Sequence, residues 1–453
     1  MYSLRRSRFV GPAMLFMTLI AFAGVGHTSV ADEPAPNSAA GKWPQFLGPD
    51  RNGISSETGL LTEWPAAGPR EVWRVPGGVG MSGLAIQSGK LLTLVQKADR
   101  QWLACLDAAT GKTLRTYQGS EAVEEVILSN GVLFTVSRKG PGERENYAPA
   151  NGRVGDQAKV GQEFFWNEEP RVVMAFEAAT GKQLWAKQTR ISPLTLAADQ
   201  QRLYFHDGES LTALDPQTGT PVWIGTPVSR RRQFTFNFGP RLVVWKDVVL
   251  YAGGDGKMIS CDSATGKQLW ESDHPNSGYQ SPQDLMVVDG LVWCAPTTSG
   301  RDTGVFTGRD PRSGEVKKEF APDVDTYWFH HRCYIAKATD NFLIPSRTGV
   351  EFVDFEKEHW DIHHWVRGGC LYGVLPCNGL TYTPPHNCAC YPEAKLYGFN
   401  ALAPSAPTRP VPDQVPAAGR LTTGPAWQEP LAEVTEFDGN DDWPTFRHDE
   451  KRT

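Results

Sequence analysis

The side chains best suited to chemistry are concentrated between His330 and Cys390. Six of the ten histidines and five of the eight cysteines lie in this stretch. Three of them, His386, Cys388 and Cys390, fall within five positions, and thiolates with imidazole are a donor set that suits Zn²⁺ or copper. The spacing is not a standard zinc pattern, so the sequence offers these three residues as candidate metal ligands without defining a metal motif.

The same cysteines allow other interpretations. In an exported protein disulfide bonds form readily, and bridges are the first alternative to a metal site. The cysteines concerned are Cys333, Cys370, Cys377, Cys388 and Cys390. Since their number is odd, one would pair with a distant cysteine such as Cys294 or stay free and buried. Redox chemistry at Cys-Ala-Cys and plain core cysteines stay open, and the alternating His and Trp of HWDIHHW also fit a strand with one packed and one solvated face.

A repeated motif in the rest of the chain indicates the framework that must position these residues. One copy is ALDPQTGTPVW, from Ala213 to Trp223. In five copies an acidic residue stands four places before a glycine; the pairs are Asp107 and Gly111, Glu177 and Gly181, Asp215 and Gly219, Asp262 and Gly266, and Asp310 and Gly314. Three copies carry a tryptophan four places after the glycine, namely Trp185, Trp223 and Trp270. Recurrence at strict spacing indicates a repeat architecture.

Each copy of the motif is expected to form the turn between the last two strands of one unit. The acid accepts hydrogen bonds from turn amides, the glycine supplies a positive φ, and the tryptophan packs against the next unit. β-branched and aromatic runs bounded by Gly, Asp and Asn surround each copy. Counting hairpins gives seven units, at 84–119, 123–189, 194–228, 241–273, 283–320, 333–368 and 370–403.

Two segments depart from the regular repeat. A polar insertion from Gly140 to Glu169 interrupts the second unit, and such insertions form loops on one face of a repeat array, often the binding face. The last unit runs into proline where its fourth strand should be. The spare strand REVWRV, Arg70 to Val75, is therefore expected to complete that unit and close a ring, which would protect its sheet edges.

The motif resembles the pyrroloquinoline-quinone (PQQ) repeat of quinoprotein-like β-propellers. The stretch WPQFLGPDRNG, Trp43 to Gly53, also resembles the opening of secreted bacterial propellers of the BamB-like kind. The resemblance implies an all-β fold over residues 43–403, a propeller of seven PQQ-like blades (alternatively eight) closed by the N-terminal strand. It also implies that the motif tryptophans dock on the neighbouring blade, with Arg115 and Lys318 standing in the tryptophan position of two other copies.

The resemblance implies a non-catalytic scaffold of the cell envelope that binds a protein or small ligand. The alternative is a PQQ-dependent or metal-dependent oxidoreductase that uses the propeller channel. Quinoprotein dehydrogenases carry a vicinal Cys-Cys disulfide and Ca²⁺ ligands, whereas this chain has no adjacent cysteine pair and no Cys-x-x-Cys-His. PQQ is thus implied by the repeat but unsupported by site residues, so the cofactor stays unknown, and no residue is assigned a catalytic role.

Charge and the chain's two ends complete the prediction. A net charge of -6 with both signs scattered does not favour nucleic acid, and Arg230 to Arg232 fits a solvated loop better than an anion site. Residues 1–31 have the basic start, apolar run and small-residue cleavage pattern of a secretory signal, an uncleaved membrane anchor being the alternative. No later segment is apolar for long enough to cross a bilayer, so no span is expected in the mature chain. Export to the periplasm or cell envelope follows.

Linkers are expected on both sides of the propeller. Residues 32–42 connect the signal to the ring, and residues 404–442 form a Pro/Ala-rich linker. Residues 443–453 then repeat the Trp-Pro-x-Phe of Trp43. They are either a tail that docks on the ring or the start of a second module.

Overall fold

The computed structural model of the chain describes most of the predicted propeller. The described residues are 71–78, 84–97, 100–138, 166–234, 239–275, 277–278, 281–296, 304–323, 333–346, 349–370, 372–377, 379–385, 394, 396 and 398–404. By contacts the chain divides into two compact units, residues 1–402 and 403–453. The architecture given below is that of the first unit.

The described residues form strands and turns, and none of them is helical, so no helix capable of crossing a membrane is found among them. The first three sheets contain β1 (Ala85–Gln87), β2 (Lys90–Lys97), β3 (Arg100–Asp107), β4 (Thr113–Thr116), β5 (Val123–Ser129), β6 (Val132–Ser137), β7 (Arg171–Glu177), β8 (Gln183–Thr189), β9 (Ala197–Ala198), β10 (Leu203–His206), β11 (Ser210–Leu214) and β12 (Pro221–Pro227).

The next two sheets contain β13 (Arg241–Trp245), β14 (Val248–Ala252), β15 (Lys257–Asp262), β16 (Gln268–Asp273), β17 (Met286–Val288), β18 (Leu291–Trp293), β19 (Phe306–Arg309) and β20 (Val316–Phe320). The last two contain β21 (Lys337–Ala338), β22 (Phe342–Ile344), β23 (Val350–Asp354), β24 (His359–His363), β25 (Leu375–Cys377), β26 (Leu380–Thr383) and β27 (Asn400–Leu402).

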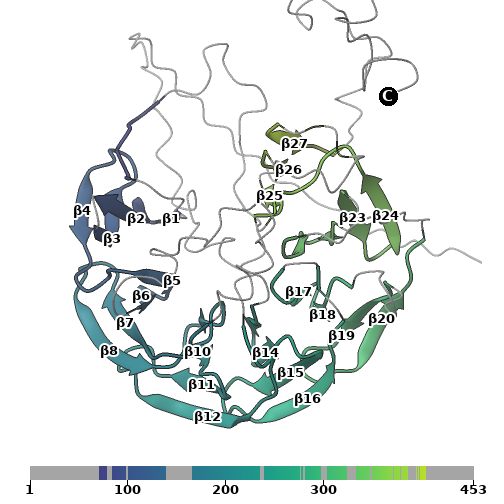
Figure 1. Cartoon of the computed structure of the whole chain (residues 1–453), viewed down its shortest axis with the longest axis horizontal. Helices are drawn as coiled ribbons and strands as arrows, with labels where there is room; N and C mark the ends of the chain where they lie inside the picture. Colours follow the sequence, from purple (N-terminus) through teal and green to yellow (C-terminus); the bar gives the residue numbers. More distant parts are fainter. Residues whose placement is uncertain are drawn as a thin grey trace, which may run out of the picture. The chain divides into compact units, whose positions relative to one another are not determined.

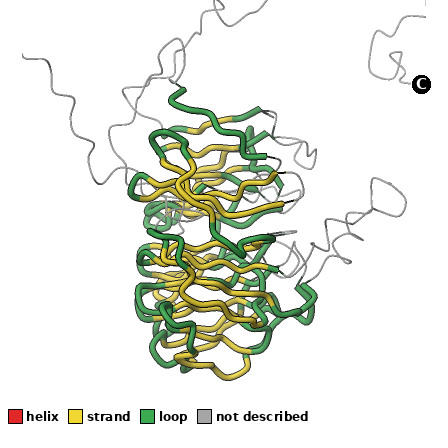
Figure 2. Tube along the Cα trace, turned by 90° about the vertical axis from the view of Figure 1, so that its left-hand side faces the viewer, coloured by secondary structure: helices red, strands yellow, loops and turns green. Residues whose placement is uncertain are grey.

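These strands make seven antiparallel sheets, each built from consecutive strands, which we call blades 1 to 7. Six sheets have four strands, whereas the seventh, β25-β26-β27, has three among the described residues. The fourth strands, such as β8, β12 and β16, lie at the rim, and the earlier strands lie closer to the centre (Figure 1). Viewed from the side, the strands run between two sets of loops (Figure 2). The prediction of a seven-bladed all-β propeller is confirmed, with one sheet in each predicted unit.

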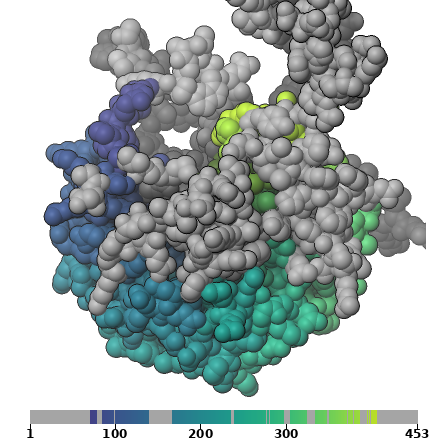
Figure 3. All heavy atoms as spheres, in the orientation of Figure 1, coloured from purple at the N-terminus to yellow at the C-terminus, as the bar shows by residue number. Residues whose placement is uncertain are grey.

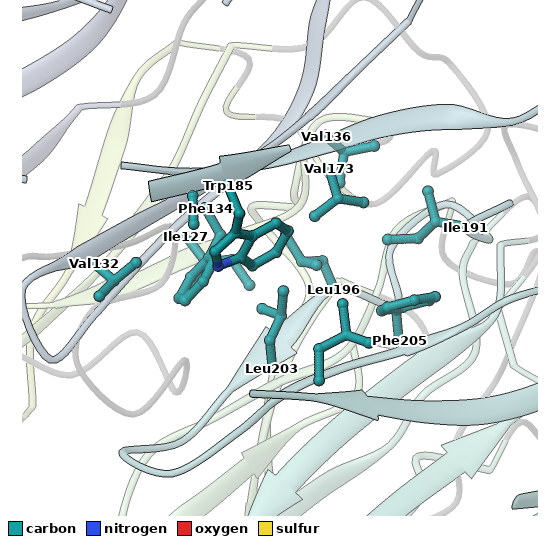
Figure 4. Close-up of a cluster of buried hydrophobic side chains, with 12 residues drawn as sticks. Ile127, Val132, Phe134, Val136, Val173, Trp185, Ile191, Leu196, Leu203 and Phe205 are labelled. Carbon is teal, nitrogen blue, oxygen red and sulfur yellow. The ribbon is translucent and has the colours of Figure 1, made fainter. Parts of the chain in front are cut away.

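The apolar core lies between blades. Blades 2 and 3 share a cluster that includes Phe134, Trp185, Leu203 and Phe205 (Figure 4). Similar clusters lie between blades 1 and 2, 3 and 4, 4 and 5, 5 and 6, and 6 and 7. The surface view shows the blades side by side in sequence order (Figure 3). Burial is therefore spread over many interfaces between neighbours, as expected for a repeat protein.

The repeated motif forms a turn between the third and fourth strands of its blade. In blade 4, Asp262 Oδ1 accepts hydrogen bonds from the amides of Ala264 at 3.1 Å and Thr265 at 3.0 Å. The Gly266 amide donates to the Asp262 carbonyl at 2.8 Å, and Gly266 has φ 72°. In blade 1, the hydrogen bond from the Thr110 hydroxyl is the main reason that the pKa of Asp107 is lowered. The acid thus organises the turn.

The motif tryptophans dock on the turn of the following blade. Trp223 Nε1 donates to the Ser263 carbonyl at 2.9 Å, and a Cβ added at Gly266 would lie 2.4 Å from the indole Cε3. Trp185 makes the same pair of contacts with Pro216 O and Gly219, and Trp270 makes them with Pro311 O and Gly314. The glycine is therefore required twice, for its positive φ and for the closeness of the ring. We call this arrangement the tryptophan docking contact.

The two motif copies that carry another residue in the tryptophan position, Arg115 and Lys318, differ in structure. Arg115 replaces it functionally: its Nη1 donates to Ala178 O at 2.9 Å, and its Cδ lies 3.3 Å from a Cβ built at Gly181. Lys318 lies on β20. The turn of the following blade has no glycine at the motif position, where Glu358 adopts φ 58°.

The N-terminal segment departs from its expected pairing. Glu71 to Gly78 forms no strand, and the described part of blade 7 contains no fourth strand, so the predicted completion of that blade is not observed there. Trp73 nevertheless makes the docking contact with blade 1: Nε1 donates to Ala108 O at 2.9 Å, and the ring covers Gly111. The segment therefore behaves towards blade 1 as the rim strand of a preceding blade would, although Arg70 lies outside the described residues.

Candidate functional site

The predicted metal ligands His386, Cys388 and Cys390 lie outside the described residues, so that prediction remains untested. Within the part of the chain that the structure describes, no group of three or more His, Cys, Asp or Glu side chains is placed to hold a metal ion. His359 is instead paired with Asp323, and the hydrogen bond between them raises the pKa of the imidazole. On β24 the side chain of Trp360 is buried and that of His359 is exposed, which fits the predicted strand with two different faces.

The cysteine cluster provides one correction. Cys294, the suggested distant disulfide partner, is a free buried thiol that contacts Met258 Sδ at 3.7 Å. Cys377, on β25, is also a free thiol. Burial raises the pKa of Cys377, Cys261 and Cys294, that of Cys261 to about 12. These thiols are protonated at neutral pH, and they are poor nucleophiles and poor metal ligands there.

The Arg230 side chain is a structural clamp, which neither reading of the basic run predicted. Its guanidinium lies 5.7 Å from the Trp166 ring centroid and 5.1 Å from that of Phe234, and its Nη2 is 2.7 Å from Glu168 Oε1. Trp166 and Glu168 belong to the described end of the predicted insertion. The clamp therefore fixes that end of the insertion against the loop that follows blade 3.

The first strands of blades 1 to 6 line a partly open cavity of about 630 Å³. Its lining residues include the apolar Val243 and Val287, contributed by blades 4 and 5. One end is lined by residues that follow these strands, including Asn130, Asp199 and Lys246; the other contains Arg241 and Lys337. The volume and mixed lining are those of a small-molecule site, so we take this central cavity as the candidate functional site.

Arg241 and Lys337 come to the same end of the cavity because each opens the first strand of its blade, β13 in blade 4 and β21 in blade 6. Lys337 is only 6% exposed. Burial and the positive charge of Arg241 lower its pKa to about 8, while the carboxylate of Asp284 opposes the shift. Asp284 is buried just before β17 of blade 5, where its Oδ1 accepts the Ala336 amide at 2.8 Å. Sequence reasoning missed these three residues because they are scattered over three units and share no motif.

The donor set of this cavity does not fit a Ca²⁺-bound quinone. Calcium takes six to eight oxygen ligands, usually with several carboxylates. Of the described lining residues only Asp199 carries one, and its oxygens accept hydrogen bonds from the Gln201 and Arg202 amides and the Tyr204 hydroxyl, all at 2.7 Å. The described lining residues therefore do not fit a Ca²⁺-bound quinone, while the metal-dependent alternative rests on His386, Cys388 and Cys390, which lie outside the described residues.

Fold and cavity together define a class of protein, the seven-bladed β-propeller of PQQ-like repeats. A family profile described as outer membrane protein assembly factor BamB matches residues 57–320, more than half of the chain. The chain belongs to this family. It is 31% identical over 156 residues to the outer membrane protein assembly factor BamB of Burkholderia pseudomallei (strain K96243), a match that covers 31% of this chain and 40% of that protein. The matched part thus spans about two fifths of the curated relative.

Solved structures of two kinds of protein are similar at low identity. BamB from Moraxella catarrhalis aligns with a TM-score of 0.40 and 15% identity, covering 66% of this chain and 85% of that one. A europium-containing methanol dehydrogenase aligns with a TM-score of 0.39 and 12% identity, covering 65% of this chain and 69% of that one.

Proposed function

We propose that this chain is an exported, non-catalytic scaffold that binds a protein partner in the cell envelope. Family membership supports the proposal, since the matching profile and the curated relative are both described as outer membrane protein assembly factors. The secretory signal predicted for residues 1–31 supports the location, and the scattered acidic charge makes nucleic acid an unsuitable partner.

The observation that carries the proposal is a group of exposed apolar side chains on the loops of the last two blades. Trp365 is 61% exposed, Tyr372 64%, Leu396 48% and Phe399 68%. We call these four residues the aromatic patch.

A backbone hydrogen bond joins two segments of the patch, and a third segment packs on β26. The Leu396 amide donates to the Trp365 carbonyl at 3.0 Å, and the Phe399 ring lies 5.8 Å from that of Tyr382. Trp365 follows β24, Tyr372 precedes β25, and the other two precede β27. Exposed aromatic residues grouped in this way are typical anchors of protein–protein interfaces, where a few of them supply most of the binding energy.

Site-specific photo-crosslinking in the native cells tests this function. A benzoylphenylalanine placed at Tyr372 is expected to capture one or a few envelope proteins, identified by mass spectrometry. The same probe at Ile224, which is 63% exposed on β12, provides the control. The double variant Trp365→Ala and Phe399→Ala should abolish capture without a change in melting temperature. Equal capture from Ile224, or no capture from Tyr372, contradicts the proposal.

A further inference from the structure

The hydrogen bonds of His206 fix which of its two ring nitrogens carries the proton. The side chain is fully buried at the end of β10, where Nδ1 lies 3.1 Å from the Gly208 amide nitrogen and 2.9 Å from Ser192 Oγ. A backbone amide can only donate, so Nδ1 is the acceptor and the neutral ring carries its proton on Nε2. A second proton would therefore be taken up at Nδ1.

Protonation at Nδ1 would remove the acceptor of the Gly208 amide. The Ser192 hydroxyl can reverse its hydrogen bond and accept from a protonated Nδ1, whereas the Gly208 amide cannot. Two donors would then face each other at a buried place, and a buried amide that has lost its acceptor is destabilising. The turn that contains Gly208, between β10 and β11, is thus the part of the structure that must move.

The Gly208 turn also holds the Arg230 clamp. The Gly208 carbonyl accepts a hydrogen bond from Arg230 Nε at 2.6 Å. A Cβ added at Gly208 would lie 3.0 Å from the Trp166 ring, so that ring packs against the turn. Arg230 in turn pairs with Glu168 and lies over the Trp166 ring. Contacts therefore run without a break from the His206 ring to the described end of the insertion.

The charged and titratable groups around His206 come from four segments. On its own turn, Asp207 favours the protonated ring, although its Oδ1 already accepts two amides of that turn. The positive charges of Arg230, after β12, and Arg190, after β8, favour the neutral ring. On β14, Tyr251 stacks on the ring at 4.6 Å, and burial raises the pKa of its hydroxyl, which stays uncharged. Burial has the largest effect and lowers the pKa of His206 to about 4.

From this geometry we propose that His206 is an acid-sensitive switch, whose protonation displaces the Gly208 turn and releases Arg230 and Trp166 from it. The described end of the insertion would then lose its attachment to blade 3. The sheet itself would stay formed, because His206 pairs with Leu211 in the β10–β11 ladder through its backbone. The switch is separate from the aromatic patch and would operate whether or not the patch binds a protein.

Nitrogen-15 NMR of the histidine rings in the full chain tests the first step. Comparison of wild type with His206→Asn identifies the signals of His206. We expect the Nε2–H form at about pH 7, and uptake of the second proton at Nδ1 as the pH is lowered. An Nδ1–H form at about pH 7 overturns the proposal, since the Gly208 amide would then have no acceptor to lose.

Hydrogen exchange followed by mass spectrometry tests the release itself. After correction for the intrinsic pH dependence of exchange, segments 166–171 and 207–210 should lose about 10- to 100-fold of their protection between about pH 7 and about pH 4.5. His206→Asn keeps a side-chain oxygen as acceptor and does not titrate, so its loss should stay below about threefold. The control His359→Gln removes an exposed histidine of β24 and should respond as wild type does.

A second variant keeps the test decisive if His206→Asn folds poorly. Arg230→Gln breaks the contact between the turn and the clamp, so segment 166–171 should already have lost its protection at about pH 7 and change little in acid. Unchanged protection of wild type in acid overturns the proposal. Equal losses in wild type and a well-folded His206→Asn overturn it as well, because another group would then be responsible.

Discussion

The interfaces between blades 2 and 5 are built differently from the interface between blades 5 and 6. Between blades 2 and 3, 3 and 4, and 4 and 5, a tryptophan from one rim strand docks on the motif turn of the next blade. Between blades 5 and 6 the tryptophan position holds Lys318, and the turn ahead has Glu358 in place of glycine. The tryptophan and the glycine are absent together, as expected if the missing glycine side chain serves the close approach of the ring, while Glu358 keeps the positive φ of the turn.

The interface between blades 5 and 6 is instead held by a cluster of aromatic rings. Trp360 lies 5.4 Å from Phe306 and 5.3 Å from Phe320, both edge-on, and Trp293 lies 6.0 Å from Phe320. Trp293 and Trp360 are at most 1% exposed. The same fold can thus join its blades by a repeated local contact or by bulky aromatic packing, and only the first leaves a motif in the sequence.

Removal of the docking ring is expected to have the largest effect. Trp223→Ala should lower the free energy of unfolding by about 3–5 kcal/mol, because a large buried aromatic is lost and a cavity remains. Urea unfolding followed by circular dichroism measures the change. Trp365→Ala, at an exposed position, should stay within about 0.5 kcal/mol of wild type. A loss below about 1 kcal/mol for Trp223→Ala would place the main stabilisation elsewhere.

The glycine partner of this ring can be tested with a matched control. Gly266→Ala introduces a Cβ only 2.4 Å from the Trp223 ring. Gly290 has nearly the same φ, 71° against 72° for Gly266, but a Cβ added there would meet no atom within 4 Å, so Gly290→Ala is the control. The control should lose about 1–2 kcal/mol from the left-handed backbone alone. Gly266→Ala should lose about 2–4 kcal/mol, since overpacking adds to that strain. Equal losses would show that the ring moves aside without cost.

Acid should weaken the interface between blades 3 and 4 through His206. The imidazole is fully buried and stacks on Tyr251 at 4.6 Å, and burial lowers its pKa from 6.5 to about 4. The neutral form is favoured by folding, so its contribution is complete above about pH 6.5 and is lost as the pH falls towards 4. The loss should be about 2–3 kcal/mol.

Unfolding measured at about pH 7 and pH 4.5 in wild type and His206→Gln tests this dependence. The variant should lose less stability on acidification, whatever its stability at neutral pH. For the exposed His359, whose pKa is raised by Asp323, the dependence runs the other way: its stabilisation is present below about pH 6.5 and falls as the pH rises. Identical acid sensitivity of wild type and His206→Gln would exclude His206 as the cause.

Loss of Arg115, which takes the place of the tryptophan between blades 1 and 2, should have the smallest effect on stability. Arg115→Ala removes one hydrogen bond to Ala178 and the aliphatic packing on Gly181, and should cost about 1 kcal/mol. Thermal melting at low and high salt measures it. A loss as large as that of Trp223→Ala would mean that arginine and tryptophan are equivalent at this position.

The sequence by itself determined the fold of this protein because the blade is a local object. The acid, glycine and tryptophan of each motif contact residues of the same turn or of the adjacent blade, so their spacing already contains the geometry. The turn of blade 6 does not match the motif in sequence, because Glu358 stands in the glycine position with the positive φ that glycine usually supplies. The turn itself is kept, since Asp354 still accepts the amides of Glu356 and Lys357.

Only the tertiary structure decided where the candidate site lies. Arg241, Asp284 and Lys337 are far apart in sequence and come together because blades 4, 5 and 6 each direct the start of their first strand to one end of the cavity. No spacing rule connects such residues, since their distance depends on how the blades are arranged around the centre. The clamp of Arg230 on Trp166 and Phe234 was hidden for the same reason: stacking is set by three-dimensional contact, and a run of three arginines has the same sequence whether it is solvated or packed.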